Sequence, residues 1–266
     1  MHAFLLHSPA SSYLLLVFAA FLGGFVNSIA GGGGFIAFPA LLKSGLLPIQ
    51  ANATTTVALW PGQFTSIAGY REELRRHLHL VIPVAVVALI GGFAGAWTLL
   101  HNSQASFLRL VPYLFLLGST AFALSGPISR AVKRRTEHYT GGKEHIHLIP
   151  LLFALLLICY YIGYFGAGAG LLTMTALAFC GVERIAEINA LKVVTTTIAN
   201  GVAVITFIAH AAVAWHDCWY MMIACAIGGY TGARNSRRVS DKVLRPVIIV
   251  FGFSLAIYFF VHRNSF

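Results

Sequence analysis

Two clusters of glycine are the residues of this sequence best suited to hold a ligand. Residues 31–34 are four consecutive glycines, and residues 166–170 alternate glycine with alanine. Each cluster precedes a short apolar segment, and glycine runs break helices, so each segment is expected to begin a new helix. The first N–H groups of a helix lack intrahelical partners and lie at its positive end, which favours binding of an anion without a fixed cation.

A pair of such helix ends could hold a small oxyanion between them. Close packing through small residues explains a single glycine cluster better, but two clusters at matching places favour a ligand site. The candidate backbone positions are Gly31, Gly32, Gly33, Gly34, Gly166, Gly168 and Gly170.

Amide and hydroxyl side chains accompany the glycines in otherwise apolar segments. These groups could donate hydrogen bonds to the oxygens of an anion, although bonding between helices explains any single threonine. Asn52 and Asn189 gain weight because they match between the two halves of the chain, while Gln63 is a weaker candidate. The main polar candidates are Asn27, Ser28, Asn52, Thr54, Thr55, Asn189, Thr195, Thr196 and Asn200.

Lys192 is the charged residue of most interest, because it begins an apolar segment three residues after Asn189. An ionisable residue within a membrane segment is a functional candidate, and Lys192 could attract an anion or change protonation during transport. Alternatively, its ammonium group could extend to the cytoplasmic interface. All eight acidic residues are expected in loops, which disfavours a cation site or a carboxylate proton relay in the membrane.

Motifs for enzymatic chemistry are missing from the sequence. There is no His-Glu-x-x-His pattern and no phosphate-binding loop, and the four cysteines form no CxxC pair. An enzyme within the membrane would need a nucleophile with its base, or a metal cluster, and the apolar segments contain neither. We therefore expect no catalytic residue, no metal and no cofactor.

The chain that positions these residues is predominantly apolar. Of its 266 residues, 58% are hydrophobic and only 10% are charged. A soluble domain needs far more charge to cover its surface, so we expect an all-α protein that crosses the membrane many times. The apolar composition excludes a disordered chain, and four cysteines are too few for a disulfide scaffold.

Ten apolar segments can be distinguished, and two of them are too short to span a bilayer comfortably. A membrane-spanning helix needs about 20 residues, so 34–47 and 170–181 could either cross the membrane or enter and return as hairpins. The segments are 11–30, 34–47, 52–70, 79–100, 107–127, 147–165, 170–181, 189–213, 216–233 and 244–262.

The two halves of the chain share an order of motifs that indicates a duplication. Residues 34–45 match residues 170–181 at a spacing of 136, and Asn52-Ala53 matches Asn189-Ala190 one residue later. A threonine triplet follows in each half. Apolar segments can resemble each other by chance, but the shared order of these motifs favours a true repeat.

The basic residues predict how the chain is oriented. Of the 18 Lys and Arg residues, 15 fall in the stretches 71–79, 128–146, 182–192 and 234–245, which all lie on one side if ten segments cross or pair as hairpins. Basic residues collect in cytoplasmic loops, so the net charge of +10 indicates topology rather than nucleic-acid binding. Both termini are then outside.

An odd number of segments in each half makes the duplication an inverted repeat. We expect a first transmembrane repeat at 1–127, a basic cytoplasmic linker at 128–146 and a second repeat at 147–266. The short helices broken at their glycines would then meet near the middle of the membrane.

These motifs resemble a known family. The stretch from Gly24 to Pro39, with Asn52-Ala-Thr54-Thr after it, resembles the first repeat of the TauE/SafE sulfite exporter family, also called TSUP, and residues 163–171 resemble its second repeat. Thr175 stands where the first repeat has Pro39, so the two half-sites differ. The resemblance covers nearly the whole chain.

The resemblance implies an inner-membrane permease for sulfite, organosulfonates such as sulfoacetate and sulfolactate, or related sulfur compounds. We expect a secondary or facilitated transporter, with export as the expected direction, whose partners are a small sulfur-containing anion and the lipid bilayer. A homo-oligomer stays open as an arrangement. An anion channel, or a permease for another small organic anion, is the alternative.

Overall fold

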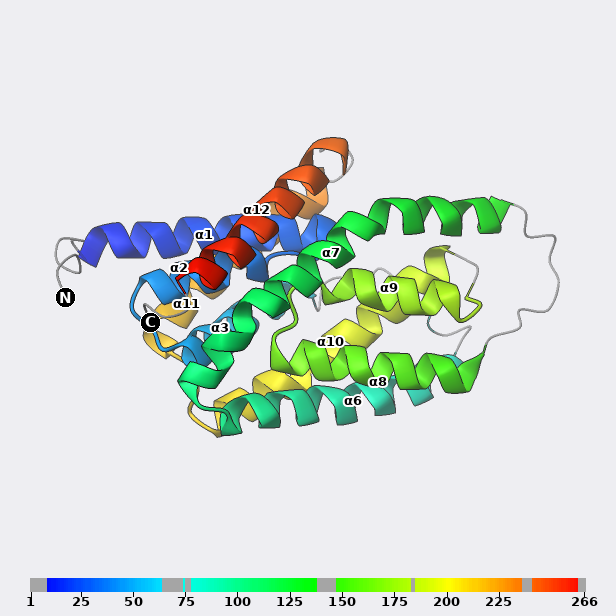
Figure 1. Ribbon diagram of the computed structural model, residues 1–266, viewed down its shortest axis with the longest axis horizontal. Coiled ribbons are helices and arrows are strands. Elements are labelled where there is room, and N and C mark those ends of the chain that lie inside the picture. The colour runs from blue at the N-terminus through cyan, green and yellow to red at the C-terminus, as the bar shows by residue number, and fades with distance from the viewer. Residues whose placement is uncertain are drawn as a thin grey trace.

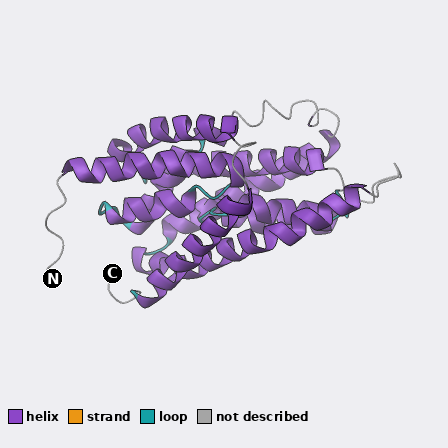
Figure 2. Cartoon of the chain, turned by 90° about the horizontal axis from the view of Figure 1, so that it is seen from above, coloured by secondary structure: helices purple, strands orange, loops and turns teal. Residues whose placement is uncertain are grey.

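The computed structural model describes residues 9–63, 74, 78–137, 147–182, 185–235 and 241–262, and these contain α-helices and no strand. Most of the helices run along one long axis, as Figure 2 shows. The expected all-α class is therefore confirmed. The helices are α1 (Pro9–Ala30), α2 (Gly34–Lys43), α3 (Pro48–Leu59), α6 (Leu78–His101), α7 (Gln104–Glu137), α8 (Leu148–Tyr164), α9 (Ala169–Phe179), α10 (Ile185–Ala209), α11 (Trp215–Asn235) and α12 (Asp241–Val261).

The surface of the helical bundle suits a lipid environment. Within the described ranges, three stretches are long and apolar enough to cross a bilayer, namely Leu80–His101, Gln104–Leu124 and Glu187–Ala209. Large apolar side chains also face outward, and Ile149, for example, is 83% exposed. Soluble monomers rarely expose wide apolar surfaces, so this surface agrees with a membrane protein.

Helix α7 extends further than the sequence pattern indicated. An apolar segment was expected at 107–127, followed by the linker, but the helix continues to Glu137. The added residues include Ala, Lys, Arg and Glu, which favour helix formation even where their polarity excludes them from a membrane. The first part of the expected linker is therefore helical, and residues 138–146 lie outside the described residues.

The two glycine clusters break the chain as expected. Helix α1 ends at Ala30 and α2 begins at Gly34, while α8 ends at Tyr164 and α9 begins at Ala169. Gly31 and Gly166 both have a φ of +77°, a left-handed conformation that glycine adopts without steric cost. The short helices thus begin at sharp changes of chain direction.

Helices from opposite halves of the chain pack along each other. The most extensive helix contacts join α1 to α11 and α6 to α8, and α7 also packs along α12. The two halves therefore interlock instead of forming separate bundles. In Figure 1, α1 starts at the end of the molecule where the N-terminus lies, whereas α8 runs back toward that end.

Glycines bring the backbones of these helix pairs into contact. A Cβ atom at Gly228 of α11 would lie 2.0 Å from the carbonyl oxygen of Phe21 in α1, and one at Gly95 of α6 would lie 2.0 Å from that of Tyr160 in α8. No side chain fits at such distances, so both helix pairs depend on glycine for their approach.

Candidate functional site

Two adjoining cavities lie where α2 and α9 begin. The larger has a volume of about 180 Å³ and is called the large cavity here. The smaller, of about 40 Å³, is called the small cavity. Five residues line both cavities, so the two spaces share a wall: Asn27, Gly31, Gln63, Gly166 and Asn200.

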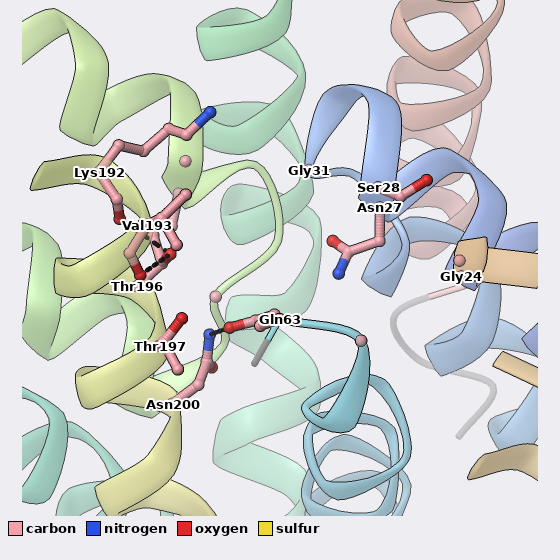
Figure 3. A pocket seen from close by; sticks show the side chains of 15 residues that line it. Gly24, Asn27, Ser28, Gly31, Gln63, Lys192, Val193, Thr196, Thr197 and Asn200 are labelled. Atoms are coloured by element: carbon pink, nitrogen blue, oxygen red, sulfur yellow. Dashed lines mark hydrogen bonds between the residues drawn. The ribbon is translucent and has the colours of Figure 1, made fainter. Parts of the chain in front are cut away.

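One face of α10 forms a wall of the large cavity. Lys192, Thr196 and Asn200 follow each other at intervals of four residues, which places them on one side of the helix. In Figure 3 they lie opposite Asn27 and Ser28 of α1. The lining also includes Gly24, Gly31, Gly62, Gln63, Gly166, Ala169, Gly170, Val193, Thr197 and Gly229.

Lys192 gives the large cavity its charge. Its Nζ donates a hydrogen bond to Oδ1 of Asn189 at 3.2 Å, and no acidic side chain is among the described residues that line either cavity. A cation without a paired carboxylate favours a ligand of negative charge. The electrostatics of the site therefore suit an anion.

The helix ends add to this positive character. Gly34 is the first residue of α2 and lines the small cavity, while Ala169 and Gly170 begin α9 and line the large one. The N–H groups of Phe35 and Ile36 in α2, and those of Ala169 and Leu171 in α9, already bond to carbonyl oxygens of the preceding turn. The two helix ends therefore contribute mainly the positive end of the helix dipole. The first residues of the two broken helices therefore line adjoining cavities.

Two buried hydroxyl groups in the cavities lack a hydrogen-bond partner among the described residues. These are Thr197 Oγ1 at the large cavity and Thr55 Oγ1 at the small cavity, and both residues are at least 95% buried. Thr196, by contrast, donates to the carbonyl oxygen of Lys192 at 2.9 Å. Buried polar groups are usually paired, so these two unpaired hydroxyls are candidates for a hydrogen bond to a ligand, although neither oxygen has appreciable accessible surface in this structure.

The structure brings most of the predicted site residues together. Those that line the large cavity are Asn27, Ser28, Gly31, Gly166, Gly170, Lys192, Thr196 and Asn200, and those that line only the small cavity are Gly34 and Thr55. Gln63, the weaker candidate, lines both cavities and accepts a hydrogen bond from Asn200 at 3.2 Å.

Three other predicted polar residues are used for packing instead. Asn52 donates to the carbonyl oxygen of Tyr164 at 3.1 Å. Thr54 Oγ1 accepts a bond from the backbone N–H of Ala214 at 3.0 Å, and Thr195 donates to Leu191 within its own helix at 2.7 Å. None of these three lines either cavity.

The remaining predicted residues also lie off the cavities. Asn189 contacts the site only through Lys192. Gly32 packs on Phe122, and Gly33 packs on the backbone of Gly23. Gly168, with a φ of +78°, caps α9 against the backbone of Gly118. These glycines allow close packing, so part of each cluster serves helix packing, which was the alternative to a ligand site.

Six residues that line the large cavity were not predicted as site residues: Gly24, Gly62, Ala169, Val193, Thr197 and Gly229. The unpredicted residues of the small cavity are Thr56, Leu59, Phe165 and Ala167. The interval of four residues from Lys192 was a usable signal for Thr196 and Asn200. This interval does not include Thr197, which lies five residues after Lys192.

The expectation that all eight acidic residues lie in loops is wrong. Glu187 lies in the first turn of α10 and is buried, although it lines neither cavity. Asp217 and Asp241 also begin helices, where the helix dipole stabilises a carboxylate, and Glu137 ends α7. The other four, Glu72, Glu73, Glu144 and Glu183, lie outside the described residues.

Comparison with known proteins places this site in context. The family model described as "Sulfite exporter TauE/SafE" matches residues 16–259. The chain is 27% identical to "Probable membrane transporter protein ORF9" of a Sinorhizobium species, over 91% of this chain and 90% of that protein. It is 28% identical to "Probable membrane transporter protein YfcA" of Escherichia coli, over 89% and 85% of the two chains.

A "Probable membrane transporter protein" of Haemophilus influenzae is 22% identical, with 91% of each chain covered. No solved structure matched the chain. The family match and the names of these relatives support a membrane transporter.

Proposed function

Because the chain belongs to the TauE/SafE sulfite exporter family, as its glycine motifs predicted, we propose that it exports a small sulfur-containing anion across the cytoplasmic membrane. Sulfite or an organosulfonate such as sulfoacetate or sulfolactate is the substrate class. Transport is secondary or facilitated, because the sequence contains no phosphate-binding loop to bind ATP.

One observation carries this proposal: Lys192 is the one cation among the described residues that line the two adjoining cavities at the starts of α2 and α9, and no described carboxylate lines either cavity. Sulfite and sulfonate groups carry three oxygens that accept hydrogen bonds. The ammonium of Lys192 supplies the charge, while the amide of Asn27 and the hydroxyl of Thr197 can donate to these oxygens. The hydroxyls of Ser28 and Thr196 already donate to backbone carbonyl oxygens.

The arrangement of the helices suits alternating access. We propose that the basic stretches face the cytoplasm, that both termini lie outside and that the halves 1–127 and 147–266 are inverted repeats joined by 128–146. Because α1 packs on α11 and α6 packs on α8, each moving unit would contain helices of both halves. Rocking of one unit against the other would open the cavities to each side in turn.

The test is transport by the purified full-length protein in proteoliposomes. Sulfite and sulfoacetate flux should saturate with concentration, and each anion should compete with the other. Lys192→Met should reduce the flux at least tenfold while the protein remains folded. Flux of a cation or a neutral solute, without flux of either anion, would refute the proposal, and flux that never saturates would indicate an anion channel.

A further inference from the structure

The walls of the two cavities correspond to each other in sequence. Asn52 and Asn189 are 137 residues apart, and the glycine pattern of residues 91–95 returns at 228–232 with the same spacing. At this spacing the residues of the small cavity and those of the large cavity form equivalent pairs. The pairs are Thr55 with Lys192, Thr56 with Val193, Leu59 with Thr196, and Gln63 with Asn200.

Two hydrogen bonds support this register. Asn200 donates to Gln63 at 3.2 Å, and Trp60 Nε1 donates to the carbonyl oxygen of Thr197, also at 3.2 Å. In both bonds the partners are 137 residues apart. Residues related by an approximate two-fold axis meet their own equivalents at that axis, so the two cavities are the two sides of one symmetric frame.

The chemistry of the two sides nevertheless differs. The large cavity has the ammonium of Lys192 where the small cavity has the neutral hydroxyl of Thr55. Leu59, Phe165 and Ala167 make the walls of the small cavity more apolar. The positive end of α2 also reaches the small cavity at Gly34, but a helix end carries only about half a unit charge. A fully anionic group is therefore favoured on the Lys192 side, and a neutral polar group suits the Thr55 side.

The hydroxyl of Thr55 identifies what the small cavity can bind. Thr55 is 5% exposed, and its Oγ1 has no hydrogen-bond partner among the described residues. The neighbouring hydroxyls do not serve the cavity, since Thr56 already donates to the carbonyl oxygen of Asn52 at 3.0 Å and Thr54, which accepts from the backbone N–H of Ala214, lines neither cavity. A buried hydroxyl is unfavourable when unpaired. The Oγ1 atom itself has almost no accessible surface, so the Thr55 side chain has to turn toward the cavity to form one hydrogen bond with a group that enters it.

The volume of the small cavity limits the size of that group. A water-sized group needs roughly 10–15 Å³, so a cavity of about 40 Å³ admits about three such groups. A second sulfonate, which has four non-hydrogen atoms and a negative charge, is too large and finds no cation there.

Building on the proposed anion function, we infer that the small cavity is a subsite for a short neutral arm of the ligand. The oxyanion head lies beside Lys192, and the arm passes the wall shared at Gly31 and Gly166. A hydroxyl or carbonyl oxygen two or three atoms from the head forms a hydrogen bond with Thr55 Oγ1. Within the proposed class of sulfur oxyanions, the tightest ligand is then one whose arm ends in a neutral oxygen, whereas sulfite, which has no arm, and sulfoacetate, whose arm is charged, bind more weakly.

A series of ligands with one head and different arms tests this subsite. Binding of methanesulfonate, ethanesulfonate, 2-hydroxyethanesulfonate and sulfoacetate to the purified full-length protein would be measured by calorimetry. We expect 2-hydroxyethanesulfonate to bind roughly three- to tenfold more tightly than ethanesulfonate, because it adds one hydrogen bond. Sulfoacetate should bind more weakly than 2-hydroxyethanesulfonate, because its arm is charged.

Substitution of Thr55 provides the second part of the test. Thr55→Val removes the hydroxyl at nearly constant volume, so it should abolish the preference for the hydroxyethyl arm over the ethyl arm. Thr206→Val is the matched control, because Thr206 is equally buried but lies outside both cavities and donates to Val202 in its own helix at 2.8 Å. That variant should keep the wild-type preference.

Equal affinities of the wild-type protein for the ethyl and hydroxyethyl sulfonates would overturn the subsite, as would a preference that persists in Thr55→Val. The wild-type comparison decides the matter even if Thr55→Val fails to fold. Failure of the anion function itself is distinguishable, because methanesulfonate, which has no polar arm, would then not bind at all.

Discussion

Asn200 of α10 donates a hydrogen bond from Nδ2 to Oε1 of Gln63 at 3.2 Å, and the two residues are 137 positions apart in the sequence, as Asn52 and Asn189 are. Both residues line both cavities. A dashed line marks their hydrogen bond in Figure 3. The bond therefore joins the halves at the wall that separates the anionic head from its proposed arm. Any motion that separates the halves at this point has to break it.

The Gln63–Asn200 pair should act as one unit in transport. Gln63→Ala and Asn200→Ala each remove the same bond, so each should change sulfite flux by a similar factor. The double variant should add little to either one, and the coupling energy should be about 0.5–3 kcal/mol. Flux measured in proteoliposomes for the four proteins gives this cycle, and fully additive effects would show that the two residues act separately.

Lys192 should contribute more to anion affinity than any other lining residue. Lys192→Met keeps the length of the side chain but removes its charge, and hydrogen bonds to charged groups contribute about 1.5–3 kcal/mol. The affinity for methanesulfonate should fall roughly 10- to 100-fold, as measured by calorimetry. Lys43→Met is the control, since Lys43 is exposed at the end of α2 and lines neither cavity. A similar loss in both variants would count against a site at Lys192.

The two matched asparagines should respond differently to substitution. Asn52→Ala leaves the buried carbonyl oxygen of Tyr164 without its partner, so it should lower the free energy of unfolding by about 1–3 kcal/mol. The variant that folds should bind methanesulfonate normally. This differs from the expectation from sequence alone, which gave Asn52 a direct role in binding.

Asn189→Ala should act through Lys192, whose ammonium it orients. We expect a smaller loss of methanesulfonate affinity than in Lys192→Met, and no further loss when Asn189→Ala is added to Lys192→Met. An effect of Asn189→Ala that persists without the lysine would mean that Asn189 contacts the anion by itself.

Composition and glycine position were enough to predict the helical class and the two broken helices. The reason is physical: apolar runs need helices in a membrane, and residues 31–34 cannot continue one without a large entropic cost. The length of α7 could not be predicted in the same way, because its last turns to Glu137 are polar and helical at once. Hydropathy indicates where a membrane segment ends, not where its helix ends.

The kinds of side chain at the site were predicted correctly, but only some of the individual residues were. Asn52 and Asn189 were selected because their positions match in the two halves of the sequence. A matching position does not require contact with a ligand, and neither residue lines a cavity. The face of a helix decided the outcome: Thr196 lines the large cavity, while Thr195, one residue earlier, points elsewhere and bonds to Leu191. A helical spacing of four from Lys192 separates these two threonines, whereas the threonine triplet alone does not.

Two adjacent glycines of α11 allow the helix packing to be tested separately from the site. A Cβ atom at Gly228 would lie 2.0 Å from the carbonyl oxygen of Phe21, whereas one at Gly229 would lie 3.8 Å from its nearest neighbour, the carbonyl oxygen of Gly24. Gly228→Ala should force α1 and α11 apart and destabilise the protein by about 1–3 kcal/mol. Gly229→Ala should leave stability unchanged or raise it by up to about 1 kcal/mol through helix propensity.

Thermal unfolding of the two variants in detergent is the measurement, because Gly229 also lines the large cavity and transport would mix two effects. Unfolding temperatures that fall equally, or that fall only in Gly229→Ala, would contradict the close contact of α1 with α11. The same contact in the other half predicts that Gly95→Ala, which meets the backbone of Tyr160 at 2.0 Å, destabilises the protein as Gly228→Ala does.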